Sequence, residues 1–397
     1  MATLTAPPRP TGDAPVAVPR LELVPEDRRG YLGPVTALQI IVIELAAVTV
    51  AVVVAATRAR SLALLAVALF VANLLVVAVF IRSGGTWWYQ QRLARSRLAR
   101  RRRAARAATD PVTALAPGLS IRTVFDRGSR IGVGQDSNGW YAVLEAMQPQ
   151  TLRGERSGLL PLDRLVRVFS ESAVPVSALQ VVSHTVPAPT DVLDPRAPCR
   201  QAYPELVVGE AIAAYQVLWV AVRLNPADAA AAAASRGGGL AGVDRALAAA
   251  VGRIGKALTT ADVPYQVLDA EGLQAALALS VGSADNGYEH WTAWQAGDCA
   301  YTCLRLTRWP QQPPAELFAR LAAVPARAVS VALVLQPSGA RIAVRGLVRV
   351  ACQPDALRTT VADLTGAARA AGARLERVDG EHGPGVYATA PTGGGLL

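Results

Sequence analysis

The side chains that could do chemistry are few and scattered along the chain. The three histidines are His184, His290 and His382. Each could in principle serve a serine or cysteine nucleophile, but none lies in a nucleophile elbow or a similar signature. Cys299 and Cys303 are four residues apart, whereas zinc sites normally use Cys-x-x-Cys pairs and four ligands. We therefore predict no catalytic centre and no metal site, and we expect His382 to lie in a loop.

Two glycine-containing segments could bind phosphate. A Walker A loop begins with glycine, ends with Ser or Thr and follows a strand, whereas residues 250–257 begin and end with alanine inside a predicted helix. Gly237 to Gly239 precede a predicted helix, and the free N–H groups of a helix start can hold an anion. Glycine-rich loops are far commoner than phosphate sites, so we predict no cofactor and leave a ligand of this loop open.

Two apolar runs lie near the start of the chain, at Val35 to Ala56 and at Leu62 to Ile81. Each has about 20 residues, which at about 1.5 Å per helical residue crosses a hydrocarbon core of roughly 30 Å. We therefore predict a two-helix transmembrane hairpin over residues 34–82. Residues 1–33 are rich in proline and polar residues, and we expect them to form a flexible tail.

The net charge of the chain is concentrated after the second run. Residues 82–109 hold nine arginines and no acidic residue, out of a net charge of +10 for the whole chain. Because basic residues next to a span stay in the cytoplasm, we predict a two-pass inner-membrane protein with cytoplasmic N- and C-termini. The cysteines then lie on the reducing side of the membrane, where free thiols are expected; they are Cys199, Cys299, Cys303 and Cys352.

Residues 83–109 are predicted to form a basic juxtamembrane helix. Its aromatic residues suit the headgroup level, and its arginines would each gain about 1 kcal/mol near anionic lipid. A basic helix can also bind a protein or the phosphates of nucleic acid, but the neutral domain that follows argues against nucleic acid. We therefore predict a membrane-interface collar, with anionic lipid headgroups as partners, formed by Trp87, Trp88, Tyr89, Arg92, Arg95, Arg97, Arg100, Arg101, Arg102, Arg103 and Arg106.

Three polar residues interrupt the apolar runs. Gln39 and Glu44 lie in the first run and Asn73 in the second. Polar and ionisable groups are costly inside a membrane and usually mark contacts or function. We predict that these three side chains make transmembrane helix contacts, either across the hairpin or with a partner.

The residues after 109 predict an α/β domain with a mixed sheet. Alternating segments separated by glycine-containing turns predict an antiparallel meander over residues 121–146, and the alanines at 229–234 are expected to lengthen a loop. A proline-rich segment at 187–198 marks a boundary, which gives cytoplasmic subdomains at 110–195 and 196–397. The similar order of elements in the two halves suggests that the subdomains are alike. Further strands are predicted at 176–185, 216–224, 265–268, 300–308, 329–336, 341–351 and 374–378, and helices at 162–171, 243–259, 270–279, 315–323 and 355–371.

Short motifs spread along the chain resemble one known family. They follow the two apolar runs and the Trp- and Arg-rich stretch, and they are Ala114-Leu-Ala-Pro-Gly-Leu119, the Gly-Trp140 strand, Arg236-Gly-Gly-Gly239, Arg308-Trp309-Pro310, Arg345 to Ala351 and Asp379-Gly-Glu381. Together they resemble EccE, the membrane subunit of actinobacterial type VII (ESX-like) secretion systems. The resemblance implies a membrane complex with EccB, EccC and EccD subunits, in which EccC is the ATPase and EccE is a peripheral, stabilising and non-enzymatic component. It implies no catalytic residue.

Three functional hypotheses follow. The first is a non-enzymatic structural subunit of a type VII secretion membrane complex. The alternative is a membrane-tethered α/β enzyme of transferase type, which would use the loop at Gly237. The lack of paired acids at metal-ligand spacing counts against the alternative. A membrane-bound DNA-binding regulator is least favoured, because the domain after residue 109 has no net positive charge.

Overall fold

The computed structural model describes residues 37–57, 62–80, 82–83, 86–106, 108–147, 162–172, 174–188, 198, 213–282, 287–311, 314–339 and 341–395. The predicted flexible tail at 1–33 and the predicted subdomain boundary at 195 and 196 lie outside these residues.

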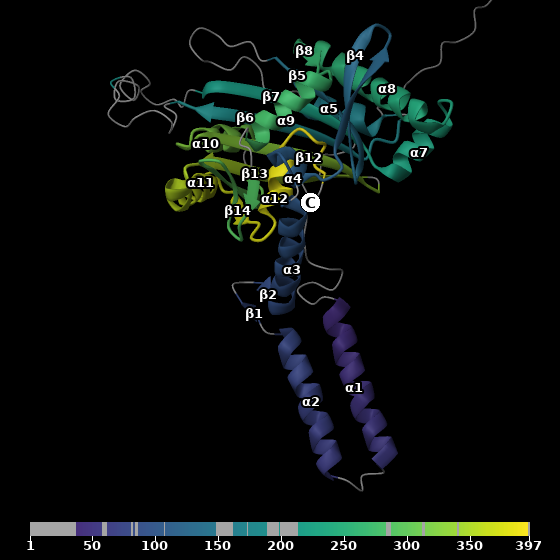
Figure 1. Ribbon diagram of the computed structural model, residues 1–397, viewed down its shortest axis with the longest axis vertical. Coiled ribbons are helices and arrows are strands. Elements are labelled where there is room, and N and C mark those ends of the chain that lie inside the picture. The colour runs from purple at the N-terminus through teal and green to yellow at the C-terminus, as the bar shows by residue number, and fades with distance from the viewer. Residues whose placement is uncertain are drawn as a thin grey trace, which may run out of the picture.

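Two antiparallel helices form a stalk that projects from the rest of the molecule (Figure 1). They are α1 (Ala37–Thr57) and α2 (Leu62–Phe80). Most of their large apolar side chains point outward, with Leu45 and Phe70 exposed by 63% and 69%. Among the described residues one segment, Gln39–Ala56, is long and apolar enough to cross a membrane, whereas α2 contributes a shorter apolar stretch, Leu65–Val77. The helical hairpin is therefore present, but a second membrane span is not confirmed.

A basic helix joins the stalk to the sheet domain. After a short β1–β2 ladder (Arg82–Ser83 and Thr86–Trp87) the chain forms α3 (Trp88–Ala105) and then α4 (Pro111–Leu115). A helix is therefore present within the predicted range 83–109, from Trp88 to Ala105.

One twelve-stranded sheet forms the body of the molecule, and its described pairings are antiparallel. The predicted combination of helices with a large sheet is thus confirmed, in an antiparallel rather than a mixed form. Its main strand order is β3-β4-β5-β7-β6-β12-β13-β11-β10-β9. The first part consists of β3 (Ser120–Asp126), β4 (Ser129–Asp136), β5 (Gly139–Ala146), α5 (Leu162–Ser170), β6 (Ala178–Pro187), β7 (Ala213–Leu224), α7 (Pro226–Ala234), α8 (Gly239–Thr259), β8 (Tyr265–Val267) and α9 (Ala270–Val281).

The second part repeats this arrangement. It consists of β9 (Gly287–Glu289), β10 (Trp294–Ala296), β11 (Cys299–Arg308), α10 (Pro314–Ala322), β12 (Ala328–Ser338), β13 (Arg341–Cys352), the 3₁₀ turn η1 (Pro354–Ala356), α11 (Leu357–Ala370), β14 (Arg374–Arg377) and α12 (His382–Thr389). In each part the third strand pairs with two different strands: β5 pairs with β4 and β8, and β11 pairs with β10 and β14. The first part therefore ends with α9, and the second part begins with β9.

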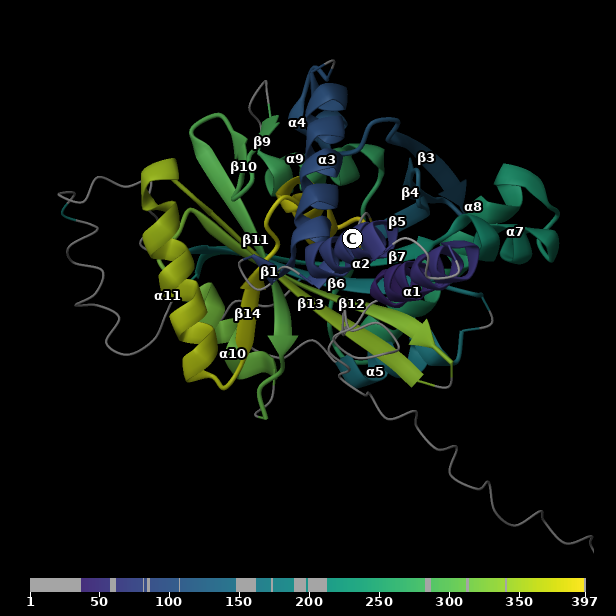
Figure 2. The ribbon, with the colours of Figure 1, turned by 90° about the horizontal axis from the view of Figure 1, so that it is seen from below.

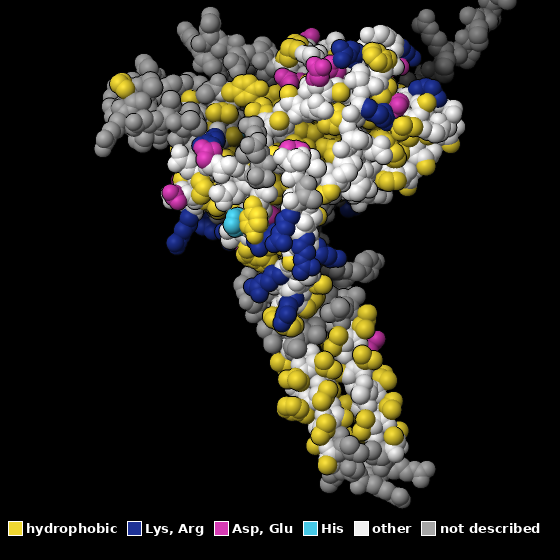
Figure 3. All heavy atoms as spheres, in the orientation of Figure 1, with side chains coloured by type: hydrophobic (Ala, Val, Ile, Leu, Met, Phe, Trp, Pro, Cys, Tyr) yellow, Lys and Arg dark blue, Asp and Glu magenta, His cyan; other side chains and the backbone are white. Residues whose placement is uncertain are grey.

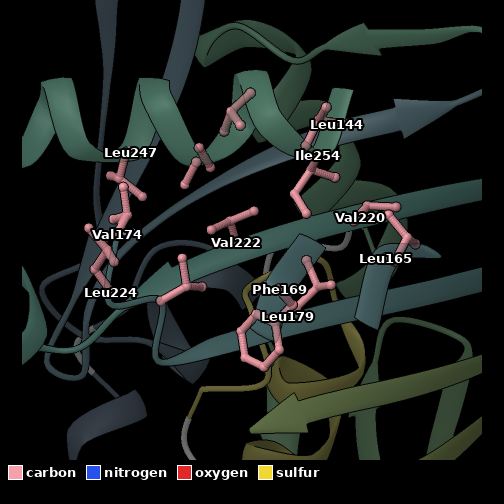
Figure 4. Close-up of a cluster of buried hydrophobic side chains, with 14 of the residues drawn as sticks. Leu144, Leu165, Phe169, Val174, Leu179, Val220, Val222, Leu224, Leu247 and Ile254 are labelled. Atoms are coloured by element: carbon pink, nitrogen blue, oxygen red, sulfur yellow. The ribbon is translucent and has the colours of Figure 1, made fainter. Parts of the chain in front are cut away.

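Helices cover both faces of the sheet. On one face α5, α7 and α8 pack on the first part through Leu165, Phe169, Leu247 and Ile254, among others (Figure 4). Helices α10 and α11 cover the second part on the same face. The opposite face carries α9, α12 and α4. Seen from the stalk, α3 also lies over this second face (Figure 2).

Two sequence-based expectations about local structure were wrong. The alanines at 229–234 form the helix α7 rather than a longer loop, because Asn225 caps its start by accepting from the N–H of Asp228 at 2.7 Å and Pro226 occupies the first turn. His382 was expected in a loop, yet it begins α12 and is fully buried. Pro384 is tolerated there because it lies in the first turn, where N–H groups have no partner within the helix.

The segment after α12 is held by side chains from the middle of the sheet. The Gln180 amide oxygen accepts hydrogen bonds from the backbone N–H groups of Thr392, Gly393 and Gly394 at 3.1, 2.7 and 3.1 Å, and its amide nitrogen donates to the Ala388 carbonyl at 2.7 Å. Gln180 is completely buried. One side chain therefore satisfies four backbone groups that have no strand to pair with.

We predict that Gln180→Ala lowers the free energy of unfolding by about 3 kcal/mol, because buried backbone groups left without a partner each cost about 1–3 kcal/mol. Chemical unfolding of the detergent-solubilised chain, followed by tryptophan fluorescence, measures the change. Gln266→Ala on β8 is the control, because Gln266 is exposed and surface changes usually stay within about 0.5 kcal/mol. Equal stability of the two variants would refute this account of Gln180.

Candidate functional site at the basic helix

The C-terminal half of α3 packs against the sheet domain. It contacts α4 and the edge strand β9, and Figure 2 shows it crossing in front of the sheet on the stalk side. Leu98 is 5% exposed, in contrast to the exposed residues on either side of it. This helix is the link through which the stalk meets the domain, so its contacts define the candidate site.

Glu289 of β9 is the centre of this contact. Its carboxylate accepts two hydrogen bonds from the Arg101 guanidinium, at 2.9 and 3.0 Å, and one from the Gly383 N–H at 2.9 Å. Arg101 also donates to the Gly380 carbonyl. Glu289 is 4% exposed, and bidentate Arg–carboxylate pairs are both strong and directional. This pair therefore fixes the position and the rotation of α3 on the domain.

Three further arginines reinforce the contact. Arg102 donates to the Glu289 carbonyl oxygen at 2.5 Å and lies 5.0 Å from the centre of the Tyr288 ring. The Arg95 guanidinium lies 5.5 Å from the Trp291 ring, and Arg97 lies 3.8 Å from a Glu381 oxygen at an exposed position. Cation–π contacts and exposed ion pairs each contribute about 1 kcal/mol or less, so they supplement the Arg101–Glu289 pair.

The structure divides the predicted arginine collar between two faces of α3. Arg95, Arg97, Arg101 and Arg102 contact the domain, as described above. The remaining four are exposed: Arg92, Arg100, Arg103 and Arg106. Arg92 lies over the Trp88 ring at 5.0 Å, Tyr89 is half-buried, and the side chain of Trp87 lies outside the described residues. Half of the collar thus has protein contacts that the sequence did not reveal.

The three polar residues of the stalk are in different environments. Gln39 is completely buried and Glu44 is exposed. Asn73 is exposed on α2. Glu44 and Asn73 therefore face outward from the hairpin.

Cys303, His382 and Asp379 come together in space, and among the described residues this grouping is the one most like a catalytic triad. The geometry does not support nucleophilic catalysis. His382 Nδ1 accepts from the Cys303 backbone N–H at 3.1 Å, so its proton resides on Nε2, which lies 3.6 Å from Asp379. Burial raises the pKa of the Cys303 thiol to about 12. The imidazole is thus engaged with a backbone amide, and the thiol remains protonated.

The same grouping explains the glycines of α12. A Cβ at Gly385 would lie 2.7 Å from the Cβ of Cys303, and one at Gly383 would lie 3.0 Å from the Glu289 carboxyl carbon. Burial lowers the pKa of His382 despite the neighbouring Asp379 carboxylate. His382 is therefore a neutral packing residue that holds α12 tightly against β11.

The other chemical candidates in the sequence occupy structural positions. Residues 250–257 lie inside α8, and Gly238 is the residue before α8 begins. Cys299, Cys303 and Cys352 are free and buried. Within the described ranges, no three His, Cys, Asp or Glu side chains are grouped to hold a metal ion. Two small hollows, one between α5 and α8 and one where α3 meets β9, have room for only about one water molecule each.

A buried polar network lies beneath α12, and sequence reasoning did not find it. Arg223 forms a bidentate pair with Asp136 at 2.8 and 2.6 Å, and the Tyr387 hydroxyl donates to the same carboxylate at 2.8 Å. Burial alone would raise the pKa of Asp136, but the hydrogen bonds and charge of Arg223 hold it below its usual value. Arg223 Nε also donates to the Thr392 carbonyl at 2.8 Å, so the pair ties β4, β7, α12 and the final segment together.

A second buried arginine caps the end of α12. Arg349 is 1% exposed and donates to the Val386 carbonyl at 3.2 Å and to Ser330 Oγ at 2.8 Å. A cation suits the last turn of a helix, because the helix dipole places partial negative charge there. Ser330 in turn lies 2.8 Å from His184 Nδ1. Burial, together with the Arg349 cation, lowers the pKa of His184 to about 3, so His184 is neutral.

A stretch in the middle of the chain matches a known protein family. Residues 212–306 match the family model described as "Putative type VII ESX secretion system translocon, EccE". The resemblance to EccE is therefore confirmed. The EccE match runs from β7 through α7, α8 and α9 to β11 and so includes Glu289. The description of the matched family as a translocon suggests a membrane location. A comparison with the curated proteins found no match.

We predict that Arg101 and Glu289 are energetically coupled. In a double-mutant cycle of Arg101→Gln and Glu289→Gln, the coupling free energy should be about 1 kcal/mol, because the carboxylate is buried while the guanidinium is partly solvated. Chemical unfolding of the four proteins gives this value. The matched control cycle combines Arg106→Gln with Glu289→Gln and should give less than about 0.5 kcal/mol. Similar coupling in both cycles would contradict the assigned contact.

We predict a loss of stability in acid that depends on His184. The folded-state pKa of His184, about 3, is below the unfolded value of about 6.5, so the unfolded chain binds the additional proton. Stability therefore falls as the pH drops below about 6.5, by about 2 kcal/mol at pH 5 from this residue. His184→Asn keeps a polar atom near Ser330 and should reduce the decline between pH 7 and pH 5. The exposed His290→Gln is the control, and an unchanged decline in His184→Asn would contradict the prediction.

Proposed function

We propose that this chain is a non-enzymatic structural subunit of a type VII protein secretion membrane complex, and that it stabilises the periphery of that complex. The observation that carries the proposal is the EccE match over residues 212–306. The partners would be EccB-, EccC- and EccD-like subunits, as the resemblance implies. The Cys303–His382–Asp379 geometry and the small size of the two hollows support a structural rather than a catalytic role.

We further propose that α1 and α2 cross the inner membrane as a two-pass hairpin with both termini in the cytoplasm. The outward-facing apolar side chains of both helices support this arrangement, as does the arginine-rich stretch after α2. In Figure 3 the apolar side chains cover the stalk, and basic side chains gather at the neck between the stalk and the sheet domain.

At the start of α3, Trp87, Trp88, Tyr89 and Arg92 would meet the headgroups. Trp88 is exposed next to Arg92, and an aromatic ring with an adjacent cation suits the boundary between apolar and charged lipid. Anionic lipid headgroups are therefore proposed as partners of this end of the helix.

Within the membrane, Glu44 and Asn73 would contact helices of partner subunits. Both are exposed on the outside of the hairpin, and a polar group facing lipid is costly until it finds a partner. Gln39 is buried and would make its contact nearer the cytoplasmic end of α1.

The test is extraction of the tagged full-length chain from native membranes in mild detergent, followed by measurement of particle size and of the proteins that travel with it. We expect a particle of megadalton order that contains a multi-domain ATPase and a many-span subunit. Deletion of the chain should destabilise that complex. An intact and active complex without the chain would contradict the proposal.

A lone monomer or dimer after gentle extraction would instead favour the alternative, a membrane-tethered transferase. Ligand screening by thermal shift then follows, because a ligand that binds the folded state raises the unfolding midpoint.

A further inference from the structure

Three arginines form a row on the free side of α3. Arg100 and Arg103 are three residues apart and are neighbours on the helix surface, and Arg106 follows at the same interval in the turn directly after Ala105, where α3 ends. All three are exposed. Within the described part of the chain they form no hydrogen bond and no ion pair. The opposite side of the helix carries Leu98 and Arg101, which face the domain.

The three positive charges of Arg100, Arg103 and Arg106 repel one another. Helix α3 has no acidic residue along its 18 residues, so no carboxylate of its own helix neutralises the row. Like charges three and four residues apart on a helix repel one another. Carboxylates of another molecule would offset this repulsion and would themselves be attracted to the arginines.

The position of the row favours a protein over a lipid surface as the source of those carboxylates. Arg103 lies 15 residues after Trp88, which is about 22 Å along the helix axis. Exposed charges are largely screened beyond about 8 Å at physiological salt. Figures 1 and 3 show α3 leading away from the stalk, with basic side chains continuing up to the domain.

The docking of α3 also prevents the row from reaching the membrane by tilting. To lie flat on a bilayer the helix would have to release Arg101 and Arg102 from Glu289. Arg92, in the second turn of α3, is therefore the arginine closest to the proposed headgroup level, whereas the row at the other end of the helix lies beside the domain.

We propose that Arg100, Arg103 and Arg106 form a docking surface for an acidic segment of a neighbouring protein subunit. This inference rests on the proposed function, because it requires the chain to act within a complex. The partner segment would carry Asp or Glu side chains at three- or four-residue spacing on a helix, or a short run of them in an extended chain. Such a contact would set orientation and association rate, and it would weaken with salt.

Photo-crosslinking in the native complex tests the proposal directly. Photoreactive benzoylphenylalanine in place of Arg103 should give an adduct whose peptide mass maps to an Asp- and Glu-rich segment of another subunit. The same group in place of Arg369, which is exposed on α11, is the control and should not give that adduct. Adducts with lipid alone, or with a segment that lacks acidic residues, would overturn the proposal.

Charge reversal gives an independent measurement. The triple variant Arg100→Glu, Arg103→Glu and Arg106→Glu should reduce the partner subunits recovered with the chain about tenfold, as expected for the loss of three exposed ion pairs. The control triple changes Arg358, Arg369 and Arg374, also exposed, to Glu and should recover as much partner as the wild type. Unfolding midpoints show whether each variant is folded, and a Gln triple replaces the Glu triple if that one is not.

The outcomes separate this inference from the proposed function. If the wild-type chain is extracted without partner subunits, both the proposed function and the docking surface are contradicted. If the wild type travels with the complex and the Arg100, Arg103 and Arg106 triple does so equally well, only the docking surface fails. A triple variant that keeps its partners but loses binding to vesicles containing phosphatidylserine would assign the row to lipid instead.

Discussion

The pairing of β6 with β12 is the contact on which the rest of the domain depends. Seven residue pairs, from Leu179 opposite Leu335 to Thr185 opposite Val329, join the two repeated parts into one sheet. Without this pairing, β6 and β12 would each expose a long apolar strand edge, and such edges are prone to non-native pairing. The same junction aligns the two faces of the sheet, so that α9 of the first part and α12 of the second lie on one side. The site where α3 docks is built on that side.

Much of the fold could be predicted because it depends on local patterns. The meander β3–β5 followed from alternating apolar residues and from turns that contain Gly128 and Gly139, both with positive φ. Long apolar strands such as β12 and β13 were predicted almost to their ends. The short strands β9 and β10 were not predicted. Helix α12 was missed because its Gly-Pro-Gly start is set by close contacts with Cys303 and Glu289 rather than by helix propensity.

The candidate site was less predictable for the same reason. The arginine stretch could be located from composition alone, but its division into a docked and a free face depends on Glu289, which is 188 residues away in sequence from Arg101. Likewise, His184 and Arg349 lie in strands whose sequences are mainly apolar. Their shared contact with Ser330 depends on the pairing of β6, β12 and β13, which the sequence pattern does not show. Sequence patterns report neighbours along the chain, whereas these sites are made by neighbours in the sheet.

The capture of the final segment by Gln180 has a consequence for the order in which the domain can form. Gly394, one of the groups that Gln180 binds, is synthesised 214 residues after it. Until then the amide of Gln180 and the Nε–H of Arg223, which donates to the Thr392 carbonyl, must remain hydrated or find temporary partners, because buried polar groups without partners are costly. The middle of the sheet therefore cannot reach its final, dry state while the ribosome is still making the second part. Closure of the core is a late, long-range step, of the kind that slows folding.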